Sequence, residues 1–458
     1  MDDDFQKVLV VGLGFRTGLA SANFLAKLGK DVTVTDIKTH DELRDIIEKL
    51  SSGVKVIAGF QSPSILDEGF DLIVLSPGVP VTIPLIQEAL KRDIPVVAEI
   101  ELAYRYMKGM IIGITGTDGK STTTSLTGHV LKELGFKAIV GGNIGIPLIS
   151  LVGETSDDSV AVIELSSFQL ETIDSFKPDV SSILNLTPDH LDRYNSMEDY
   201  FAAKKRIFKN QGDDDYFIYN ADNEYLERDK NLYPPKTLSF STTNESRDAF
   251  FRDNKIWFKR EGNYIPVVEA EKLNIIGIHN IQNVMAALLM IFALFDKRGI
   301  KIDYDKVAQA CYCFKGLEHR MEFAGVIKGR TFVNDSKATT IGAVEMAVKS
   351  IKDKGVLIIG GRTKGDDYTR LADVVRGKAR AIVLIGESSE LFAEIFKDFR
   401  CVRATNMEDA VAKALRESCE GDMILLSPAC ASFDMFSSYD ERGKVFKACV
   451  KKLSEELN

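Results

Sequence analysis

Residues 110–125 read MIIGITGTDGKSTTTS, an apolar strand that enters a glycine loop and continues as a helix. In such a turn glycines let backbone N–H groups face phosphate oxygens, and the N-terminus of the helix adds positive potential. Lys120 is then placed to neutralise the β and γ phosphates of a nucleotide, and Ser121 to bind Mg²⁺. The spacing departs from the general pattern, because Gly113 lies one residue too early. The segment still predicts a nucleotide-binding loop, since a lysine followed by hydroxyl residues at this turn is seldom needed for packing.

Short β-branched runs alternate with helical stretches along the whole chain. This rhythm is typical of parallel α/β sheets. Three of the expected strands run into small-residue turns, at Gly12, Gly116 and Gly360, and each turn marks the ligand-facing edge of a separate sheet. We therefore expect an α/β protein with three sheets. The expected strands are residues 8–11, 32–35, 72–75, 110–114, 160–165, 182–186, 356–359, 381–385 and 423–426.

Chain length supports the same division. A chain of 458 residues exceeds what one hydrophobic core usually organises. We expect an N-terminal Rossmann-like nucleotide-binding domain over residues 1–98, a central P-loop domain over 99–316 and a C-terminal Rossmann-like α/β domain over 317–458. A polar, hairpin-like stretch over 213–265, which contains the only tryptophan, Trp257, predicts a small antiparallel insertion in the central domain.

Composition limits the class of protein. Hydrophobic residues make up 45% and charged residues 27%, as in an ordinary globular protein, and the net charge of −9 argues against a surface built to neutralise nucleic acid. The acidic start of the sequence is unlike a secretion signal, and no apolar run reaches the roughly 18 residues of a membrane span. Of six cysteines only Cys311 and Cys313 are close, without the second pair of a zinc site. We expect a cytoplasmic protein with reduced thiols and no nucleic-acid or membrane partner.

Two strand ends downstream of the phosphate loop carry candidate Mg²⁺ ligands. Glu164 lies at the end of one expected strand, and residues 185–194, which include His190, follow the next. In a parallel sheet these strand ends meet at the edge that also carries the phosphate loop, where a Mg²⁺ ligand belongs. Taken alone, a solvated strand-end glutamate and a structural histidine would be the simpler interpretations of these two residues.

The first domain opens with VLVVGLGFRTGLA, in which Gly12, Gly14 and Gly18 follow an expected strand, and Asp36 ends the second strand. This arrangement is typical of a dinucleotide-binding fold. The third glycine lies one position late for G-x-G-x-x-G, however. The motif by itself is therefore compatible with a dinucleotide, a mononucleotide or no ligand.

The phosphate loop also resembles that of a known family. Residues 115–122, TGTDGKST, resemble the T-G-T-N-G-K-[ST] loop of the Mur ligase family, with Asp118 where that family usually has asparagine. Further motifs follow in the family's order along nearly the whole chain. The resemblance implies ATP-dependent formation of an amide bond through an acyl phosphate. The residues implied to bind ATP are Thr117, Gly119, Lys120, Ser121, Thr122, Asn280, Asn283, Arg320 and Asp335.

Two of the ATP motifs lie at the end of the central domain and the start of the third. Residues 277–287 resemble the family's G-x-H-N-x-x-N-x-x-A-A motif, in which Asn280 and Asn283 offer donors and acceptors to adenine. A capped amphipathic helix would explain that pattern nearly as well in isolation. Residues 319–322 resemble H-R-x-E, where Arg320 would reach ATP phosphates after domain closure.

The family uses two Mg²⁺ ions and a carbamylated lysine, so the resemblance implies the same here. By the family's A-x-K-x-x-[IL] pattern Lys204 carries the carbamate, with Lys205 as the neighbouring alternative. A lysine reacts with CO₂ as the neutral amine, and a partly desolvated pocket near other cations lowers its pKa. His190 resembles a ligand of the second ion. The implied metal ligands are Ser121, Glu164, His190 and Lys204, and the implied catalytic residues are Lys120, His190 and Lys204.

In this family the first domain binds a UDP-linked substrate. Residues 75–79 resemble an S-P-G-[IV] turn that contacts the nucleotide, and residues 141–145 resemble a G-G-N-I-G loop on the sugar side. The residues implied to bind the UDP substrate are Phe15, Arg16, Thr17, Asp36, Ile37, Ser76, Pro77, Gly78, Asn143 and His190.

The amino-acid pocket distinguishes the members of the family. Residues 360–366 and 426–436 both resemble the member that adds D-glutamate to UDP-N-acetylmuramoyl-L-alanine, and the D-N-P-R signature of the diamino-acid-adding member is absent. Residues 334–339 match the family's N-D-S-K-A-T segment. The residues implied to bind the amino acid are Lys337, Thr339, Lys364, Ser432, Phe433 and Tyr439.

These implications describe a monomeric cytoplasmic enzyme of peptidoglycan precursor synthesis, which cell shape and division require. It would use ATP, Mg²⁺, UDP-N-acetylmuramoyl-L-alanine and D-glutamate. Within the family, a member that adds another amino acid and a ligase like folylpolyglutamate synthase stay as alternatives. Outside it, the first glycine motif would suit a nicotinamide-dependent dehydrogenase, which leaves the Lys120 loop unexplained. The phosphate loop alone would suit a nucleotide-regulated binding module.

Overall fold

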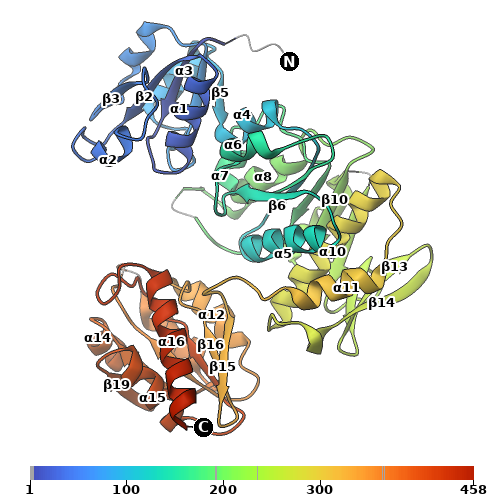
Figure 1. Cartoon of the computed structure of the whole chain (residues 1–458), viewed down its shortest axis with the longest axis vertical. Helices are drawn as coiled ribbons and strands as arrows, with labels where there is room; N and C mark the ends of the chain where they lie inside the picture. Colours follow the sequence, from blue (N-terminus) through green and yellow to red (C-terminus); the bar gives the residue numbers. More distant parts are fainter. Residues whose placement is uncertain (1–4, 191–192, 235, 364, 366, 458) are drawn as a thin grey trace. The chain divides into compact units, whose positions relative to one another are not determined.

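Three β-sheets organise the chain, each with helices packed against it (Figure 1). The predicted three-domain α/β fold is confirmed. Two of the sheets lie in one compact unit, formed by the chain through Ala270 together with Ile281–Cys311. The third lies in a second unit, formed by Glu271–Asn280 and the chain from Tyr312 onward. The structure, a computed structural model, describes residues 5–190, 193–234, 236–363, 365 and 367–457.

The N-terminal sheet has the strand order β3-β2-β1-β4-β5, and all its neighbouring strands are parallel. After β1, Gly12 adopts a φ of 94°. A Cβ atom on Gly18 would lie 2.1 Å from the Gly12 carbonyl oxygen, so glycine at position 18 lets the first helix pack closely against this turn. The elements are β1 (Lys7–Val11), α1 (Thr17–Lys27), β2 (Asp31–Asp36), α2 (Arg44–Ile47), β3 (Lys55–Ala58), a 3₁₀ helix (Pro63–Glu68), β4 (Leu72–Leu75), α3 (Pro84–Lys91) and β5 (Val96–Ala98).

The central sheet has the order β14-β13-β12-β11-β10-β9-β6-β8-β7. Strands β8 and β9 are buried along their whole length, as expected for parallel strands covered on both faces. The strand elements are β6 (Met110–Thr115), β7 (Ala138–Gly142), β8 (Val160–Glu164), β9 (Val180–Ile183), β10 (Tyr216–Asn220), β11 (Thr237–Ser241), β12 (Ala249–Arg252), β13 (Lys255–Arg260) and β14 (Asn263–Glu269). The helices are α4 (Glu99–Tyr106), α5 (Lys120–Glu133), α6 (Leu148–Leu151), α7 (Ser167–Leu170), α8 (Met197–Lys205), α9 (Glu224–Arg228), α10 (Ile278–Arg298) and α11 (Tyr304–Cys313), with 3₁₀ turns at Val152–Glu154, Arg206–Phe208, Lys230–Leu232 and Ala270–Lys272.

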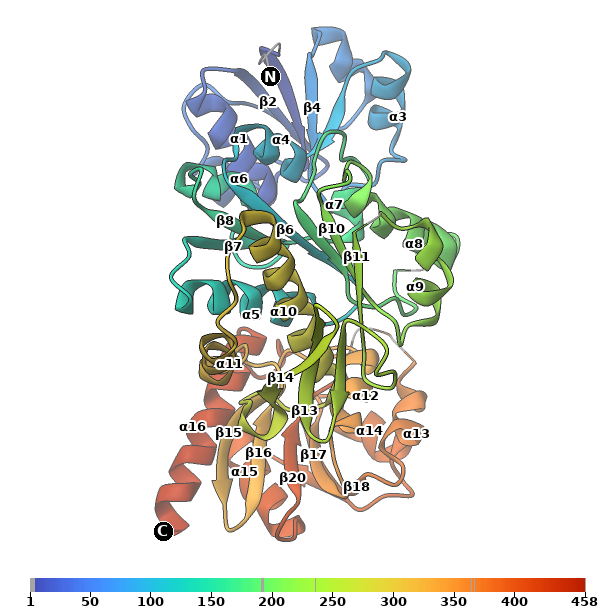
Figure 2. The same ribbon diagram turned by 90° about the vertical axis from the view of Figure 1, so that its right-hand side faces the viewer.

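The antiparallel part of the central sheet is smaller than the stretch 213–265 expected to form it. Strands β10, β11 and β12 each pair in parallel with the strand before them in the sheet and extend it. Only β12, β13 and β14 form an antiparallel meander, whose last two strands make a hairpin visible in Figure 2. The predicted insertion therefore began too early in the sequence. Strands β10 and β11 are short and lie among polar loops, so they resemble hairpin strands although they belong to the parallel part of the sheet.

The C-terminal sheet has the order β15-β16-β20-β17-β18-β19, in which only β15 is antiparallel to its neighbour. Two apolar clusters pack on the faces of this sheet, as parallel strands require. The elements are β15 (Glu322–Ile327), β16 (Arg330–Asn334), α12 (Ile341–Lys349), β17 (Gly355–Ile359), a 3₁₀ turn (Tyr368–Arg370), α13 (Leu371–Val375), β18 (Ala379–Ile385), α14 (Ser389–Ile395), β19 (Cys401–Ala404), α15 (Met407–Glu417), β20 (Met423–Leu426) and α16 (Tyr439–Leu457).

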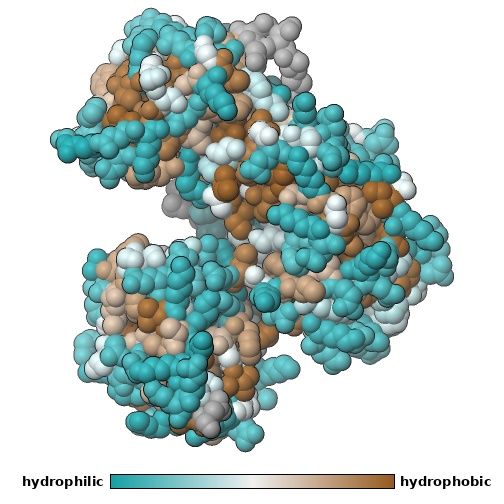
Figure 3. All heavy atoms as spheres, in the orientation of Figure 1, coloured by the Kyte–Doolittle hydropathy of each residue, from teal (hydrophilic) through white to brown (hydrophobic). Residues whose placement is uncertain are grey.

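One helix of the described chain, α10, is long and apolar enough to cross a membrane by length and composition alone, although the sequence was expected to contain no such segment. In the fold, 83% of its most apolar window is buried inside the protein. A core helix of a globular protein passes the same test. Polar and charged side chains cover most of the surface visible in Figure 3.

Candidate functional site

The phosphate loop leaves β6 and enters α5 with two glycines in the left-handed region. Gly116 has a φ of 150° and Gly119 a φ of 78°. A Cβ atom on Gly119 would lie 2.4 Å from the side-chain oxygen of Asn283, which also accepts a hydrogen bond from the Thr123 hydroxyl at 3.1 Å. The loop therefore needs glycine at position 119 for space as well as for conformation. It also places Asn283 of α10, a predicted adenine ligand, against the first turn of α5.

Asn185, just beyond β9, holds the first half of the loop. Its side-chain oxygen accepts hydrogen bonds from the backbone N–H groups of Asp118 at 2.8 Å and Thr117 at 3.1 Å, and its amide donates to the Asp118 carbonyl at 3.0 Å. The Thr117 hydroxyl lies 3.3 Å from the Tyr200 hydroxyl. These two N–H groups already have acceptors. Backbone groups for a phosphate must therefore come from Gly119 onward, where Lys120, Ser121 and Thr122 begin α5.

Two lysine amines meet at one carbonyl of this loop. Lys120 donates to the carbonyl oxygens of Gly116 at 2.9 Å and Thr117 at 2.6 Å, and Lys204 of α8 donates to the same Gly116 oxygen at 2.8 Å. Lys204 is only 1% exposed. Burial, with a smaller contribution from the charge of Lys120, holds the pKa of the Lys204 amine well below its ordinary value. Lys205, the alternative from the sequence, forms an ion pair with Asp229 at 2.9 Å.

Glu164, at the end of β8, lies beside the phosphate loop because it pairs with Ile114 of β6. Its carboxylate is 2% exposed. One oxygen accepts a hydrogen bond from the Asn143 side chain at 2.7 Å, and the other is buried with no hydrogen-bond partner among the residues that the structure describes. A buried carboxylate oxygen without a partner is costly, and a cation would satisfy it.

A magnesium ion fits this donor set. Among the described residues no three His, Cys, Asp or Glu side chains group to hold a metal. Mg²⁺ commonly takes one or two carboxylates and completes its shell with phosphate and water oxygens. The free oxygen of Glu164 and the hydroxyl of Ser121, at the start of α5, are donors of this kind.

His190 lies in the loop after β9 with a left-handed backbone, at a φ of 54°. Its ring centre is 4.8 Å from that of Phe168, and the guanidinium of Arg193 lies 3.9 Å from the Phe168 ring centre. Arg193 is also paired with Glu171 at 2.7 Å and donates to the Pro77 carbonyl at 3.2 Å. The structure thus joins the His190 loop to the turn after β4.

Arg193 and Asn185 were not assigned roles from the sequence. The partner of Arg193 in the N-terminal sheet is 116 residues away along the chain. Asn185 acts on a loop 67 residues earlier. No local pattern reports contacts of this range, although both residues lie in the polar loop around His190 that the sequence singled out.

Eight of the ten predicted UDP-binding residues lie at the turns after β1, β2 and β4, whereas Asn143 and His190 lie in the loops after β7 and β9. The Asp36 carboxylate accepts the backbone N–H groups of Leu13 at 2.7 Å and Lys38 at 2.9 Å, and the Ser76 hydroxyl donates to the Gly12 carbonyl at 2.7 Å. These side chains brace the turns. By contrast Phe15 is 56% and Ile37 72% exposed, so their apolar side chains remain open to a ligand. Thr17 starts α1, and Pro77 and Gly78 form the turn that Arg193 reaches.

Arg16 connects the first turn of the N-terminal sheet to the glycine loop after β7. Its guanidinium donates to the carbonyl oxygens of Gly145 at 2.8 Å and Asn143 at 3.2 Å. Asn143 in turn donates to Glu164. A chain of contacts therefore runs from the N-terminal sheet to the carboxylate beside the phosphate loop.

In the second unit, three segments that the sequence assigned to amino-acid binding converge. Ala429 donates its N–H to the Ala338 carbonyl at 2.9 Å, and Arg362 and Ala431 exchange backbone hydrogen bonds of 2.9 and 3.0 Å. Arg442 of α16 ties two of these segments. It donates to the Ser336 carbonyl at 2.8 Å and to the Cys430 carbonyl at 3.1 Å, and it is 2% exposed. Burial lowers the pKa of its guanidinium to about 10.

The predicted ligands of this unit lie around that junction. The Lys337 amine lies 5.2 Å from the Tyr439 ring centre, Ser432 is buried, and Phe433 is 63% exposed. Thr339 follows directly in the same segment. Burial raises the pKa of the Asp335 carboxyl to about 7, although hydrogen bonds from Met321 and Ser427 oppose the shift. Arg320 and Asn280 belong to this unit as well, and Lys364 lies outside the described residues.

The fold and the loop geometry define an α/β nucleotide-binding protein of the phosphate-loop type, with a separate α/β unit at its C-terminal end. Sequence models of three domains match the chain in order. They are the Mur ligase MurD-like N-terminal domain over residues 6–98, the Mur ligase middle domain over 114–291 and the Mur ligase glutamate ligase domain over 319–430.

Similar proteins extend over the full length. A UDP-N-acetylmuramoylalanine--D-glutamate ligase of Koribacter versatilis is 42% identical over 459 aligned residues, which cover 100% of this chain and 99% of that protein. A protein of the same name from a Thermoanaerobacter species is 40% identical, with 98% of each chain covered. The chain therefore belongs to the Mur ligase family, and the resemblance inferred from its motifs is confirmed.

Solved structures agree on the fold. The UDP-N-acetylmuramate-alanine ligase MurC of Thermotoga maritima superimposes with a TM-score of 0.57 at 19% identity, covering 99% of this chain and 100% of that one. The MurF ligase of the same organism, in complex with ADP, gives a TM-score of 0.59 at 15% identity, covering 93% and 95%. At these identities the likeness establishes the fold alone.

Proposed function

We propose that this protein is an ATP-dependent ligase that adds D-glutamate to UDP-N-acetylmuramoyl-L-alanine, a step of peptidoglycan precursor synthesis. The observation that carries the proposal is the meeting of Lys120, Lys204 and the free oxygen of Glu164 at one edge of the central sheet. The full-length relatives that share this sequence bear the name of that ligase.

The phosphate loop is the proposed site of ATP. Lys120, the first residue of α5, faces the β and γ phosphates, and the N–H groups from Gly119 onward receive phosphate oxygens at the helix N-terminus. Ser121, Glu164 and His190 would hold Mg²⁺, which when bound offsets negative charge on the transferring phosphoryl group. Asn280 and Asn283 would contact adenine, and Arg320 and Asp335 the phosphates and ribose.

Lys204 is proposed to carry a carbamate. Its buried amine has a lowered pKa, so a larger fraction of it is neutral at physiological pH than of an exposed lysine. The neutral amine adds to CO₂ and releases one proton, which leaves a carboxylate on the side chain. That anion would offset the charge of Lys120 and add an oxygen donor beside the phosphate loop.

The two substrates would bind to different parts of the chain. The turns that carry Phe15, Arg16, Thr17, Asp36, Ile37, Ser76, Pro77 and Gly78, with Asn143 and His190, would hold the UDP-linked substrate. In the second unit, Lys337, Thr339, Ser432, Phe433 and Tyr439, with Lys364, would hold D-glutamate. Arg442 would keep two of the D-glutamate segments in place through their carbonyl groups.

The reaction would proceed in two displacements. An oxygen of the alanyl carboxylate attacks the γ phosphorus of ATP, and the bond to ADP breaks. The amine of D-glutamate then attacks the acyl carbon, loses a proton, and expels phosphate from the tetrahedral intermediate. The loop helps by holding the reacting phosphoryl group in one position, which removes much of the entropic barrier.

Phosphate release tests this function directly. Purified protein with ATP, Mg²⁺ and UDP-N-acetylmuramoyl-L-alanine should release phosphate when D-glutamate is added, and far less with L-glutamate, L-alanine or diaminopimelate. The Lys120→Ala variant should lose this activity. Equal release without an amino acid would indicate a nucleotide-regulated module instead. Calorimetric binding of a folate but not of UDP would favour a ligase like folylpolyglutamate synthase.

We further propose that the enzyme acts in the cytoplasm as a monomer. The net charge of −9 and the burial of its most apolar helix inside the fold support a protein that stays in solution. Size-exclusion chromatography with light scattering would give a mass near 50.8 kDa if this is correct.

A further inference from the structure

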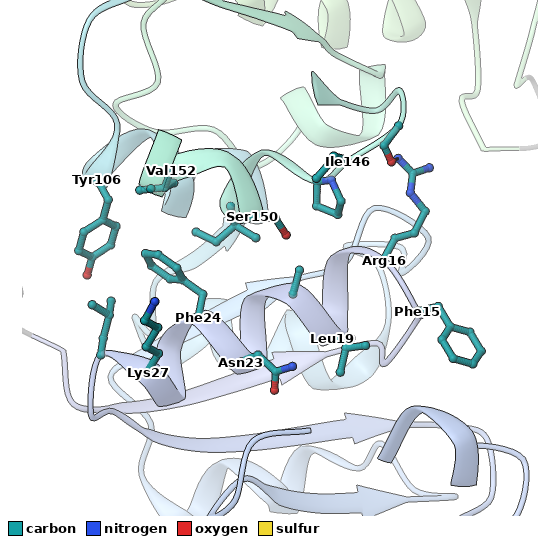
Figure 4. A pocket seen from close by; sticks show the side chains of 16 residues that line it. Phe15, Arg16, Leu19, Asn23, Phe24, Lys27, Tyr106, Ile146, Ser150 and Val152 are labelled. Atoms are coloured by element: carbon teal, nitrogen blue, oxygen red, sulfur yellow. Dashed lines mark hydrogen bonds between the residues drawn. The ribbon is translucent and has the colours of Figure 1, made fainter. Parts of the chain in front are cut away.

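A cavity of about 880 Å³ lies along helix α1, between this helix and α6 (Figure 4). Its size is in the range of sites for small molecules. Most of its wall is apolar: Phe24 and Tyr106 form an edge-to-face pair with ring centres 5.2 Å apart, and Ile146, Ile149 and Val152 also line it. The wall therefore suits a ligand with an acyl or aryl body.

The charged groups of the cavity are all positive. Arg16 and Lys27 line opposite ends of it, as Figure 4 shows, and among the described residues no aspartate or glutamate lines it. Lys27 is exposed in the last turn of α1, and its amine has no hydrogen-bond or ion-pair partner in the described part of the chain. The cavity therefore favours an anion, and an acidic group at Lys27 would meet a cation without breaking an existing pair.

This cavity differs from the proposed UDP site. A nucleotide at the strand edge would lie at the N-terminus of α1, beside Thr17. Lys27 is ten residues further along the helix, roughly 15 Å away at the rise of an α-helix. The two sites share only their border at Phe15 and Arg16.

We propose that this cavity is a second ligand site, which binds a small anionic amphiphile: one carboxylate or sulfonate group on an acyl or aryl body. The apolar body lies between Phe24, Tyr106 and Ile149, and the acidic group pairs with Lys27. The site is built from α1, from Tyr106 at the end of α4 and from the segment around α6.

The position of the site gives it a route to the phosphate loop. Arg16 at its near end holds the carbonyls of Gly145 and Asn143, and Asn143 donates to Glu164. Ile149, in its wall, donates its N–H to the buried Glu99 carboxylate at 2.6 Å. A ligand that shifts Arg16 or α6 would therefore change the orientation of Asn143 and the environment of Glu164.

Binding can be measured without either substrate. The probe is 8-anilinonaphthalene-1-sulfonate, whose fluorescence rises in apolar surroundings, and dodecanoate below its micelle concentration is the competitor. The wild-type chain should bind the probe saturably, and dodecanoate should displace it at least tenfold more strongly than dodecanol. Lys27→Glu should weaken both ligands about tenfold. Lys132→Glu, a change of an exposed lysine in the last turn of α5, should have no effect.

Three results would overturn the proposal: no saturable binding, equal displacement by dodecanol, or displacement of the probe by UDP alone. Binding only to vesicles of anionic phospholipid would identify a membrane surface instead. Ser150→Trp, which adds bulk to an exposed position of the lining, should abolish binding while circular dichroism stays unchanged. If this variant binds as well as wild type, the ligand lies elsewhere.

The regulatory consequence rests on the proposed function and is tested separately. Dodecanoate should change the rate of D-glutamate-dependent phosphate release in the wild-type enzyme several-fold, and Lys27→Glu should remove this response without changing the basal rate. If the protein binds dodecanoate but has no ligase activity, the second ligand site stands and only the proposed function is refuted. An active enzyme whose rate dodecanoate does not alter would remove the link to Glu164.

Discussion

Two buried cations, Lys204 beside the phosphate loop and Arg442 in the second unit, are held in opposite ways. Both are at most 2% exposed. Lys204 donates to one carbonyl, that of Gly116, and its pKa lies well below the ordinary value. Arg442 donates to the backbone oxygens of Ser336 and Cys430 and to the Ser336 hydroxyl, and burial lowers its pKa only to about 10.

The number and kind of hydrogen-bond acceptors around each buried cation indicate what that cation can do. A lysine with one acceptor and a neighbouring positive charge is available as a neutral amine, so it can react. An arginine with several carbonyl acceptors keeps its charge and serves as a tie between backbone segments. The first arrangement predicts a loss of chemistry on substitution, and the second predicts a loss of stability.

Replacing Lys204 should have the largest effect on activity. Lys204→Met keeps the apolar stem and removes the amine, so we expect phosphate release to fall by about 10³-fold, as for the loss of a charged group at a reacting phosphate. At pH 10.5 or above, where the amine is largely neutral in the unfolded chain as well, the free energy of unfolding should change by less than about 1 kcal/mol, because one hydrogen bond is exchanged for apolar packing. At lower pH the variant should be the more stable protein, because it carries no buried amine. The control is Lys205→Met, whose parent lysine is paired with Asp229. Similar losses in both variants would refute the distinction between the two lysines.

Replacing Arg442 should have the largest effect on stability. Arg442→Met leaves the carbonyls of Ser336 and Cys430 without their donor, which should lower the free energy of unfolding by about 3 kcal/mol. Denaturation followed by circular dichroism should show an early transition. The unfolding transition followed by Trp257 fluorescence should keep the midpoint of the wild-type protein, because Trp257 lies in the first unit. The exposed Arg416→Met serves as control, and equal shifts in the two variants would contradict the role of burial.

The two cations should also differ in the pH dependence of stability. In the unfolded chain Lys204 is protonated below about pH 10.5, whereas in the folded protein its amine stays neutral until the pH falls to its lowered pKa. Between the folded and the unfolded pKa the unfolded chain binds more protons, so the free energy of unfolding rises with pH. The slope for one group is at most about 1.4 kcal/mol per pH unit. In CO₂-free buffer the difference between wild type and Lys204→Met should rise toward high pH. The corresponding difference for Arg442→Met should be flat from pH 6 to 9, and a slope there would mean that the guanidinium titrates.

Arg193 is an intermediate case, a cation that is 18% exposed and paired with a carboxylate. Arg193→Ala should raise the KM for the UDP-linked substrate about tenfold, or about 1.4 kcal/mol, because Pro77 and the His190 loop lose their link. The kcat at saturating substrate should fall much less. Arg92→Ala, which breaks a surface pair with Asp67, should leave both constants unchanged. A lower kcat with an unaltered KM would place Arg193 in the chemistry instead.

The smallest effect is expected at Asp118, an exposed carboxylate in the phosphate loop. Asp118→Asn removes a negative charge near the phosphates and should lower the KM for ATP about threefold, an effect that salt should reduce. Asp157→Asn, on an exposed loop, provides the control. If the variant binds ATP more weakly, the carboxylate holds a cation or an active loop conformation.

Much of the architecture could be predicted from the sequence because its signals are local. The strand expected over residues 423–426 coincides with β20. The helix expected after the glycines of the phosphate loop is α5, which begins at Lys120. The strand expected over 182–186 was placed too late, since β9 ends at Ile183 and the polar loop with Asn185 begins sooner. The predicted ATP, UDP-substrate and amino-acid contacts stay predictions.

The sequence by itself determined the family, the order of the sheets' glycine turns and the types of side chain that follow them, because residue type and spacing act over a few residues. Only the tertiary structure decided which of two adjacent lysines enters the core, which oxygen of Glu164 lacks a partner, and which carbonyl Arg193 reaches. Burial and long-range pairing depend on distant segments, such as those of Arg193 and Pro77, which are 116 residues apart, and no window of sequence contains both partners.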